Sequence, residues 1–93
     1  SNKMDPILMK SFREHKDRIT QCIFSPNMKQ IISGSTDGIV LATSLKSNAR
    51  ANKFQGHKGA VTDVSINPSC SLIASCSRDA TIRIWNNNAS ASC

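Results

Sequence analysis

The feature that most constrains the fold of this chain is an internal repeat. The segment Phe12–Thr43 aligns with the segment Phe54–Trp85 without a gap. The offset is 42 residues at every matched pair, including His15 and His57, Pro26 and Pro68, and Asp37 and Asp79. A period of about 40 residues is typical of proteins in which one small structural unit stacks on its neighbours. The chain is therefore predicted to contain two copies of one unit.

Each copy shows the residue pattern of three short β-strands joined by turns. The expected strands alternate in polarity or form short runs rich in β-branched residues, and they lie at 18–24, 30–35 and 39–45 in the first copy and at 60–66, 71–77 and 80–85 in the second. Pro68 and the Asp37-Gly38 pair mark turns between them. In the last strand we expect Ile82 and Ile84 to face inward, with Arg83 and Trp85 on the other face.

A further apolar segment precedes each copy, at 6–12 and at 50–55. We expect both to form strands, so that each repeat supplies about four strands. The segment 6–12 would then be the outer strand of a preceding unit, and 50–55 would complete the unit formed by the first copy. Helical periodicity is sustained nowhere in the sequence.

Several motifs resemble the WD-repeat family. They are the Gly-His pair at 56–57, the stretch LIASCSRDATIRIW at 72–85 and the 42-residue period. The resemblance implies an all-β fold of WD40-type β-propeller blades, here about two four-stranded antiparallel blades of an incomplete propeller. The first copy is degenerate, because Glu14 stands where glycine is usual and Thr43 where tryptophan is usual. Within the family, the segment LKSNARANKFQGHK between the copies resembles that of members found in centrioles and basal bodies.

The expected organisation has four parts. Residues 1–6 are a disordered N-terminus or a vector-derived remnant, 7–46 are the first WD repeat with its preceding outer strand, 47–86 are the second repeat, and 87–93 are a polar disordered tail. Two blades cannot close a ring, since propellers have about four to eight. We therefore expect the missing blades to come from the rest of a longer chain or from self-association, or the open edges to be held by a partner.

The family resemblance implies a hydrogen-bonded tetrad that holds each blade together. In the second copy its members are His57, Ser75, Asp79 and Trp85, and in the first copy the corresponding residues are His15, Ser33, Asp37 and Thr43. A buried carboxylate needs donors, and imidazole, hydroxyl and indole groups can supply them. Since threonine cannot replace the packing area of an indole, the first network is expected to be weaker.

An enzyme is not expected. Asp, His and Ser together suggest a hydrolase, but the set recurs once per repeat, as a structural element does and a single active site does not. No Gly-x-Ser-x-Gly elbow, phosphate-binding glycine loop or HExxH motif is present. The four cysteines include no Cys-x-x-Cys pair and have no histidine at zinc-ligand spacing. We expect reduced thiols, no metal, no cofactor and no small-molecule substrate.

The net charge of +6 concerns partners rather than fold. The basic residues are scattered and are not interleaved with aromatics, which disfavours nucleic-acid binding, and no apolar run is long enough to span a membrane. The loop before the first strand and the turn after the second would share one face of each blade. That face would present Lys16, Asp17, Arg18, Thr36, Lys58 and Arg78. An ordinary solvated surface and a docking site for an acidic protein segment both fit this set.

The resemblance implies a non-catalytic protein-interaction scaffold of centrioles and basal bodies, in the cytoplasm and cytoskeleton, with a role in centriole assembly and stability. Its partners would be tubulin in microtubule triplets or centriolar scaffold proteins. An adaptor subunit of another cytosolic or nuclear complex is the alternative.

Overall fold

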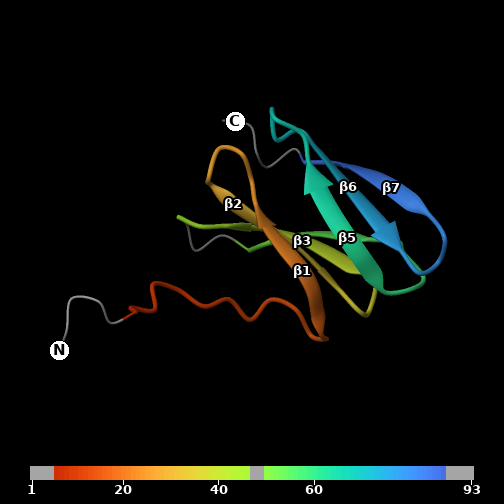
Figure 1. Cartoon of the computed structure of the whole chain (residues 1–93), viewed down its shortest axis with the longest axis horizontal. Helices are drawn as coiled ribbons and strands as arrows, with labels where there is room; N and C mark the ends of the chain where they lie inside the picture. Colours follow the sequence, from red (N-terminus) through yellow and green to blue (C-terminus); the bar gives the residue numbers. More distant parts are fainter. Residues whose placement is uncertain (1–5, 47–49, 88–93) are drawn as a thin grey trace.

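The computed structural model describes residues 6–46 and 50–87, and every regular element in these ranges is a β-strand (Figure 1). The first sheet has four antiparallel strands in chain order, β1 (Ile19–Phe24), β2 (Gln30–Ser35), β3 (Ile39–Ser44) and β4 (Asn52–Gln55). The second sheet has three, β5 (Val61–Ile66), β6 (Leu72–Ser77) and β7 (Ile82–Asn86). The predicted all-β architecture of two blade-like antiparallel sheets is confirmed.

The two sheets repeat the same backbone irregularities at the offset of 42 residues. The β1–β2 register shifts between Ile19 and Gln21, and the β5–β6 register shifts at the equivalent place. Among the residues that the structure describes, the backbone is left-handed, with positive φ, at four positions that form two equivalent pairs, Met28 with Cys70 and Gly38 with Ala80. The sequence repeat is therefore also a repeat of the local geometry.

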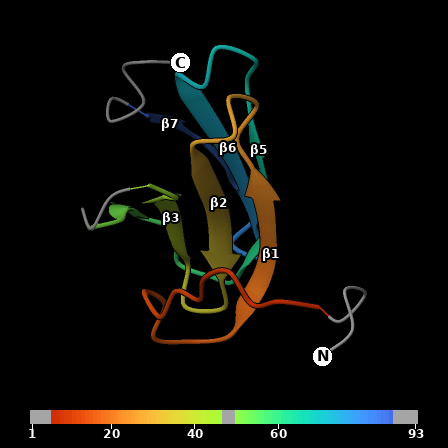
Figure 2. The same ribbon diagram turned by 90° about the vertical axis from the view of Figure 1, so that its left-hand side faces the viewer.

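The segment before β1 differs from the prediction. Residues 6–12 form no strand, because a strand needs a partner ladder and no preceding sheet is present in the described part of the chain. The segment instead crosses the side of the first sheet that faces away from the second sheet (Figure 2). It is held there by the Lys10 ammonium, whose Nζ donates to the Leu45 carbonyl oxygen at 2.5 Å. The prediction of an outer strand at 6–12 was wrong.

The main core lies between the two sheets. Its buried members come from one face of each sheet, and they are Ile32, Val40, Ala42, Val61, Val64 and Ile73. The sheets approach closely at Gly34, where an added Cβ would lie 2.5 Å from Cγ1 of Val61. Glycine is therefore required at this point of β2, since any side chain would displace β5.

Polar contacts fix the position of the second sheet on the first. The Thr20 hydroxyl donates to the Val61 carbonyl oxygen at 2.6 Å, and the Val64 N–H donates to Oε1 of Gln21 at 2.8 Å. At the other end, Nδ2 of Asn87 donates to Oε1 of Gln30 at 2.9 Å, and Asn87 is only 2% exposed. Residue 87 was expected in the disordered tail and is instead part of the blade interface. The remaining tail, 88–93, lies outside the described residues, as do residues 1–5.

The expected orientation of β7 was wrong. Ile82 is 71% exposed and Ile84 is 63% exposed, whereas Trp85 and Arg83 face toward the first sheet. The residues 42 positions earlier, Val40 and Ala42, are buried because the second sheet covers them. Ile82 and Ile84 thus occupy inter-blade core positions that no third sheet covers within the described ranges. The alternation along β7 correctly predicted which residues share a face of the sheet, but not which of the two faces the other sheet covers.

The cysteines also depart in part from expectation. Cys22 and Cys76 have free thiols, whereas Cys70, which is fully buried, takes part in a disulfide bond. The prediction of reduced thiols was wrong for Cys70, because spacing along a sequence does not show which cysteines approach one another. In the described residues there is no helix that could cross a membrane.

Candidate functional site

A polar network joins the loop before β5 to strands β6 and β7 in the second blade. Nε2 of His57 lies 2.7 Å from the Ser75 hydroxyl oxygen, and Nδ1 of His57 lies 3.1 Å from Oδ2 of Asp79. The Trp85 indole N–H donates to the same Ser75 oxygen at 2.8 Å. The four residues named from sequence are therefore brought together in one chain of hydrogen bonds.

The Asp79 carboxylate accepts several hydrogen bonds in this network. It accepts from the Lys58 backbone N–H at 2.9 Å, the Thr81 backbone N–H at 2.9 Å and the Thr81 hydroxyl at 2.5 Å. The hydrogen bond from the Thr81 hydroxyl, followed by that from the Lys58 N–H, holds the pKa of Asp79 far below its usual range. Sequence reasoning missed Thr81, whose hydroxyl also lies 3.1 Å from Nδ1 of His57. Thr81 could have been predicted from its hydroxyl-bearing side chain, which lies two residues after the turn aspartate in the sequence.

The first blade keeps only part of this network. Nε2 of His15 lies 2.6 Å from the Ser33 hydroxyl oxygen, but Nδ1 of His15 is buried without a hydrogen-bond partner. Asp37 instead accepts from the Ser35 hydroxyl within its own turn. Ile39 stands where the second blade has Thr81, so no hydroxyl bridges the histidine and the aspartate. Burial lowers the pKa of His15, against an opposing effect of the nearby Asp37 carboxylate.

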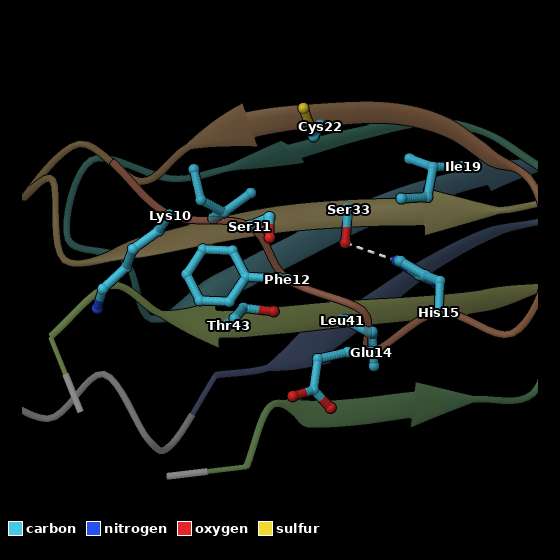
Figure 3. Close-up of a pocket in the computed structure, with 11 residues that line it drawn as sticks. Lys10, Ser11, Phe12, Glu14, His15, Ile19, Cys22, Ser33, Leu41 and Thr43 are labelled. Carbon is cyan, nitrogen blue, oxygen red and sulfur yellow. Dashed lines mark hydrogen bonds between the residues drawn. The ribbon is translucent and has the colours of Figure 1, made fainter. Parts of the chain in front are cut away.

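The largest difference between the networks is at the tryptophan. The Trp85 ring lies 5.7 Å from the Phe54 ring and 5.7 Å from the Arg83 guanidinium carbon, measured between centres. At the equivalent place in the first blade, Thr43 borders a cavity of about 200 Å³ (Figure 3). Its lining residues are Lys10, Ser11, Phe12, Glu14, His15, Ile19, Cys22, Ile31, Ser33, Leu41 and Thr43.

The six residues predicted for one face of the blades lie at the same end of both sheets. They come from the loops before β1 and β5 and from the β2–β3 and β6–β7 turns, and they are Lys16, Asp17, Arg18, Thr36, Lys58 and Arg78. We call this set the basic rim. All are exposed except Thr36, which is half-buried.

The loops of the basic rim are built alike in the two blades. The Thr36 N–H donates to the Arg18 carbonyl oxygen at 2.8 Å, and the Arg78 N–H donates to the Ala60 carbonyl oxygen at 2.9 Å. Asp17 accepts from the Arg18 N–H at 2.7 Å, and this bond, with a further one from Thr36, lowers the pKa of Asp17. The single acid of the set thus serves its own loop, and its four bases face solvent.

This arrangement does not provide a nucleophile. Ser75 is completely buried, and its oxygen is already bonded to both His57 and Trp85. A serine that attacks a substrate must be accessible to it. In residues 6–46 and 50–87 there is no group of three or more His, Cys, Asp or Glu side chains that could hold a metal ion.

Comparison with known proteins gives one family and several relatives. The family model described as "WD domain, G-beta repeat" matches residues 7–41 and 49–86. POC1 centriolar protein homolog B of Mus musculus is 50% identical over 50 residues, which are 54% of this chain and 10% of that protein. Eukaryotic translation initiation factor 3 subunit I of Aspergillus terreus is 35% identical over 83 residues, which are 89% of this chain and 24% of that protein.

A third relative, p21-activated protein kinase-interacting protein 1-like of Danio rerio, is 33% identical over 72 residues, which are 77% of this chain and 20% of that protein. The chain thus spans a quarter or less of the length of these relatives, and none of the three has the name of an enzyme. The family match covers most of the chain and coincides with the two blades. This chain belongs to the WD40-repeat family, whose repeats form protein-interaction domains.

Proposed function

We propose that the chain is a non-catalytic scaffold of centrioles and basal bodies that contributes to centriole assembly and stability. The observation that supports the centriolar assignment is the 50% identity to POC1 centriolar protein homolog B over about half of the chain. The protein of the same name from Rattus norvegicus is 47% identical over 54 residues. Both identities exceed the 35% and 33% of the other two relatives described above, over shorter matched segments.

The two sheets leave apolar surface for neighbouring blades. On β6 and β7, Leu72, Ile82 and Ile84 are exposed at 44%, 71% and 63%. Contiguous apolar surface of this kind marks a contact with another protein surface. We propose that further blades cover it, supplied by the rest of a longer chain or by association with other copies.

The basic rim is the proposed contact for a partner. Lys16, Arg18, Lys58 and Arg78 are exposed on neighbouring loops, and four positive charges at one end of two blades attract an acidic segment. A tubulin tail in a microtubule triplet, or an acidic stretch of a centriolar scaffold protein, has the required charge. Exposed ion pairs of this kind act mainly on the rate of association and weaken with salt.

The alternative is an adaptor subunit of another cytosolic or nuclear complex. The observation that favours it is the match to initiation factor 3 subunit I, which covers 89% of this chain at lower identity. The two proposals differ in the compartment where the chain accumulates.

The deciding experiment is localisation of the tagged full chain in cells with a centriole marker. Accumulation at centrioles supports the first proposal, and co-sedimentation with initiation-factor complexes without centriolar signal would replace it by the second. A Lys58→Glu/Arg78→Glu variant is expected to lose accumulation. Lys46→Glu/Arg50→Glu is the matched control and should localise normally, because it makes an equal charge change on two exposed residues at the end of the first sheet opposite the basic rim.

The solution mass, by light scattering on a sizing column, tests how the open faces are covered. A discrete species of three or four copies would support self-association into a ring. A monomer without cooperative unfolding would support completion by blades outside this chain.

A further inference from the structure

The two blades differ most where the second blade holds its tryptophan. In the second blade the indole is surrounded by Phe54, Gly56, His57 and Arg83 and is bonded to Ser75. Each of these residues, and Trp85 itself, has a counterpart 42 positions earlier that lines the cavity of the first blade, namely Phe12, Glu14, His15, Leu41, Ser33 and Thr43. The cavity in the first blade thus corresponds to the site that the Trp85 indole fills in the second blade.

The cavity has the size and lining for an aromatic ring. Its volume is about 200 Å³, and an apolar cavity of about 150 Å³ is enough to bind benzene. Leu41 replaces Arg83, so that an apolar side chain stands where the second blade has a guanidinium. Phe12 occupies the position of Phe54, the ring that packs against the indole in the second blade (Figure 3). Phe12 is 40% exposed, so the cavity can be reached from solvent.

A hydrogen-bond acceptor is present at the point where an indole N–H would arrive. In the second blade the Ser75 oxygen interacts with both the His57 ring and the Trp85 N–H, at 2.7 and 2.8 Å. In the first blade the Ser33 oxygen is bonded to His15 at 2.6 Å, and Thr43 is too short to supply the second donor. A serine hydroxyl has two acceptor lone pairs. Ser33 can therefore accept one further hydrogen bond.

We infer that this cavity binds the indole side chain of a tryptophan on a partner protein, with its N–H donating to Ser33. The second blade provides the template, since the same fold holds the same group there. The site differs from the basic rim in chemistry and position, and it does not depend on the compartment in which the protein works. A partner segment with an exposed tryptophan would complete the first blade as Trp85 completes the second.

The first test is a titration of the chain with indole and N-acetyl-tryptophanamide, followed by the backbone amide NMR shifts of Ser33, Leu41 and Thr43. Both ligands are expected to bind saturably and to shift the same amide signals. The matched ligand control is 1-methylindole, which keeps the rings but has no N–H. It should bind about fivefold more weakly, the ratio that corresponds to a net hydrogen bond of about 1 kcal/mol.

Two variants at position 43 test whether indole binds in this cavity. Thr43→Phe fills the cavity and should abolish binding, whereas Thr43→Val keeps the shape and should bind indole as the natural chain does. Absence of saturable indole binding to the natural chain would overturn the proposal. So would equal affinity for 1-methylindole, or unchanged binding by Thr43→Phe. Binding of indole but not of N-acetyl-tryptophanamide would mean a site for a free small aromatic and would overturn the assignment to a partner side chain.

Discussion

The β2–β3 turn gives the sharpest test of how the two blades meet. Gly38 has a φ of 86°, and a Cβ placed on it would lie 2.6 Å from the His57 carbonyl oxygen and 3.1 Å from that of Gly59. The turn of the first blade thus touches the backbone of the loop that begins the second blade. Because the neighbouring atoms are backbone, they cannot move aside as the end of a flexible side chain can.

Gly38→Ala should therefore destabilise the chain in two ways. A non-glycine residue in the left-handed region costs about 1–2 kcal/mol, and the overlap with a packed neighbour costs about 1–3 kcal/mol. The total is about 2–5 kcal/mol. At about 4–8 °C per kcal/mol for a chain of this size, the Tm should fall by at least about 8 °C. The assay is thermal unfolding followed by circular dichroism and by the fluorescence of Trp85.

The equivalent position in the second blade supplies the opposite change. Ala80 has a φ of 69°, so Ala80→Gly removes left-handed strain of about 1–2 kcal/mol while adding about 0.5–1 kcal/mol of unfolded-state entropy. The net expectation is stabilisation by up to about 1.5 kcal/mol. Ala51→Gly, where φ is negative, is the matched control and should destabilise by about 0.5–1 kcal/mol. If Gly38→Ala unfolds at the same Tm as the natural chain, the close approach of the two blades at Gly38 is refuted. If Ala80→Gly is destabilised as much as Ala51→Gly, the backbone strain at position 80 is refuted.

Thr43→Trp should fill the cavity of the first blade and stabilise the chain by about 1–3 kcal/mol through apolar burial and a new hydrogen bond, and an unchanged urea midpoint would contradict this. Asp79→Ala should lower the urea midpoint more than Asp37→Ala, because Asp37 lacks the donors that Asp79 has, and equal losses would remove the distinction between the networks. Since the folded-state pKa of Asp79 lies below its ordinary value near 4, its stabilising effect is complete above that pH and is lost as the pH falls further, so the advantage over Asp79→Asn should shrink between about pH 4 and pH 2. The pKa of His15 is lowered by burial, so its neutral form favours the folded state, and stability should decline as the pH falls below about 6.5. His15→Gln should flatten that decline, and an equal slope in both chains would count against the burial of His15.

Much of the fold follows from local pattern and from the repeat. The strand positions 30–35 and 39–45 were predicted within one residue, because period-two alternation and the Asp37-Gly38 turn are local signals. The residues of the second network could also be named from sequence, since the resemblance fixes their spacing. Thr81 was missed because its role depends on the turn bringing its hydroxyl back to Asp79 and His57.

The amino-acid sequence is sufficient to show that the chain consists of two related β units, where most of their strands and turns lie, and that the first unit lacks the tryptophan of the second. The burial of these residues, by contrast, depends on how the two sheets pack in space. Alternation cannot show which face of β7 is covered, because burial of Ile82 and Ile84 depends on a neighbouring sheet. A threonine in place of a tryptophan does not show whether the space collapses or stays open, since that depends on how Phe12, Leu41 and the rest of the first blade pack around it.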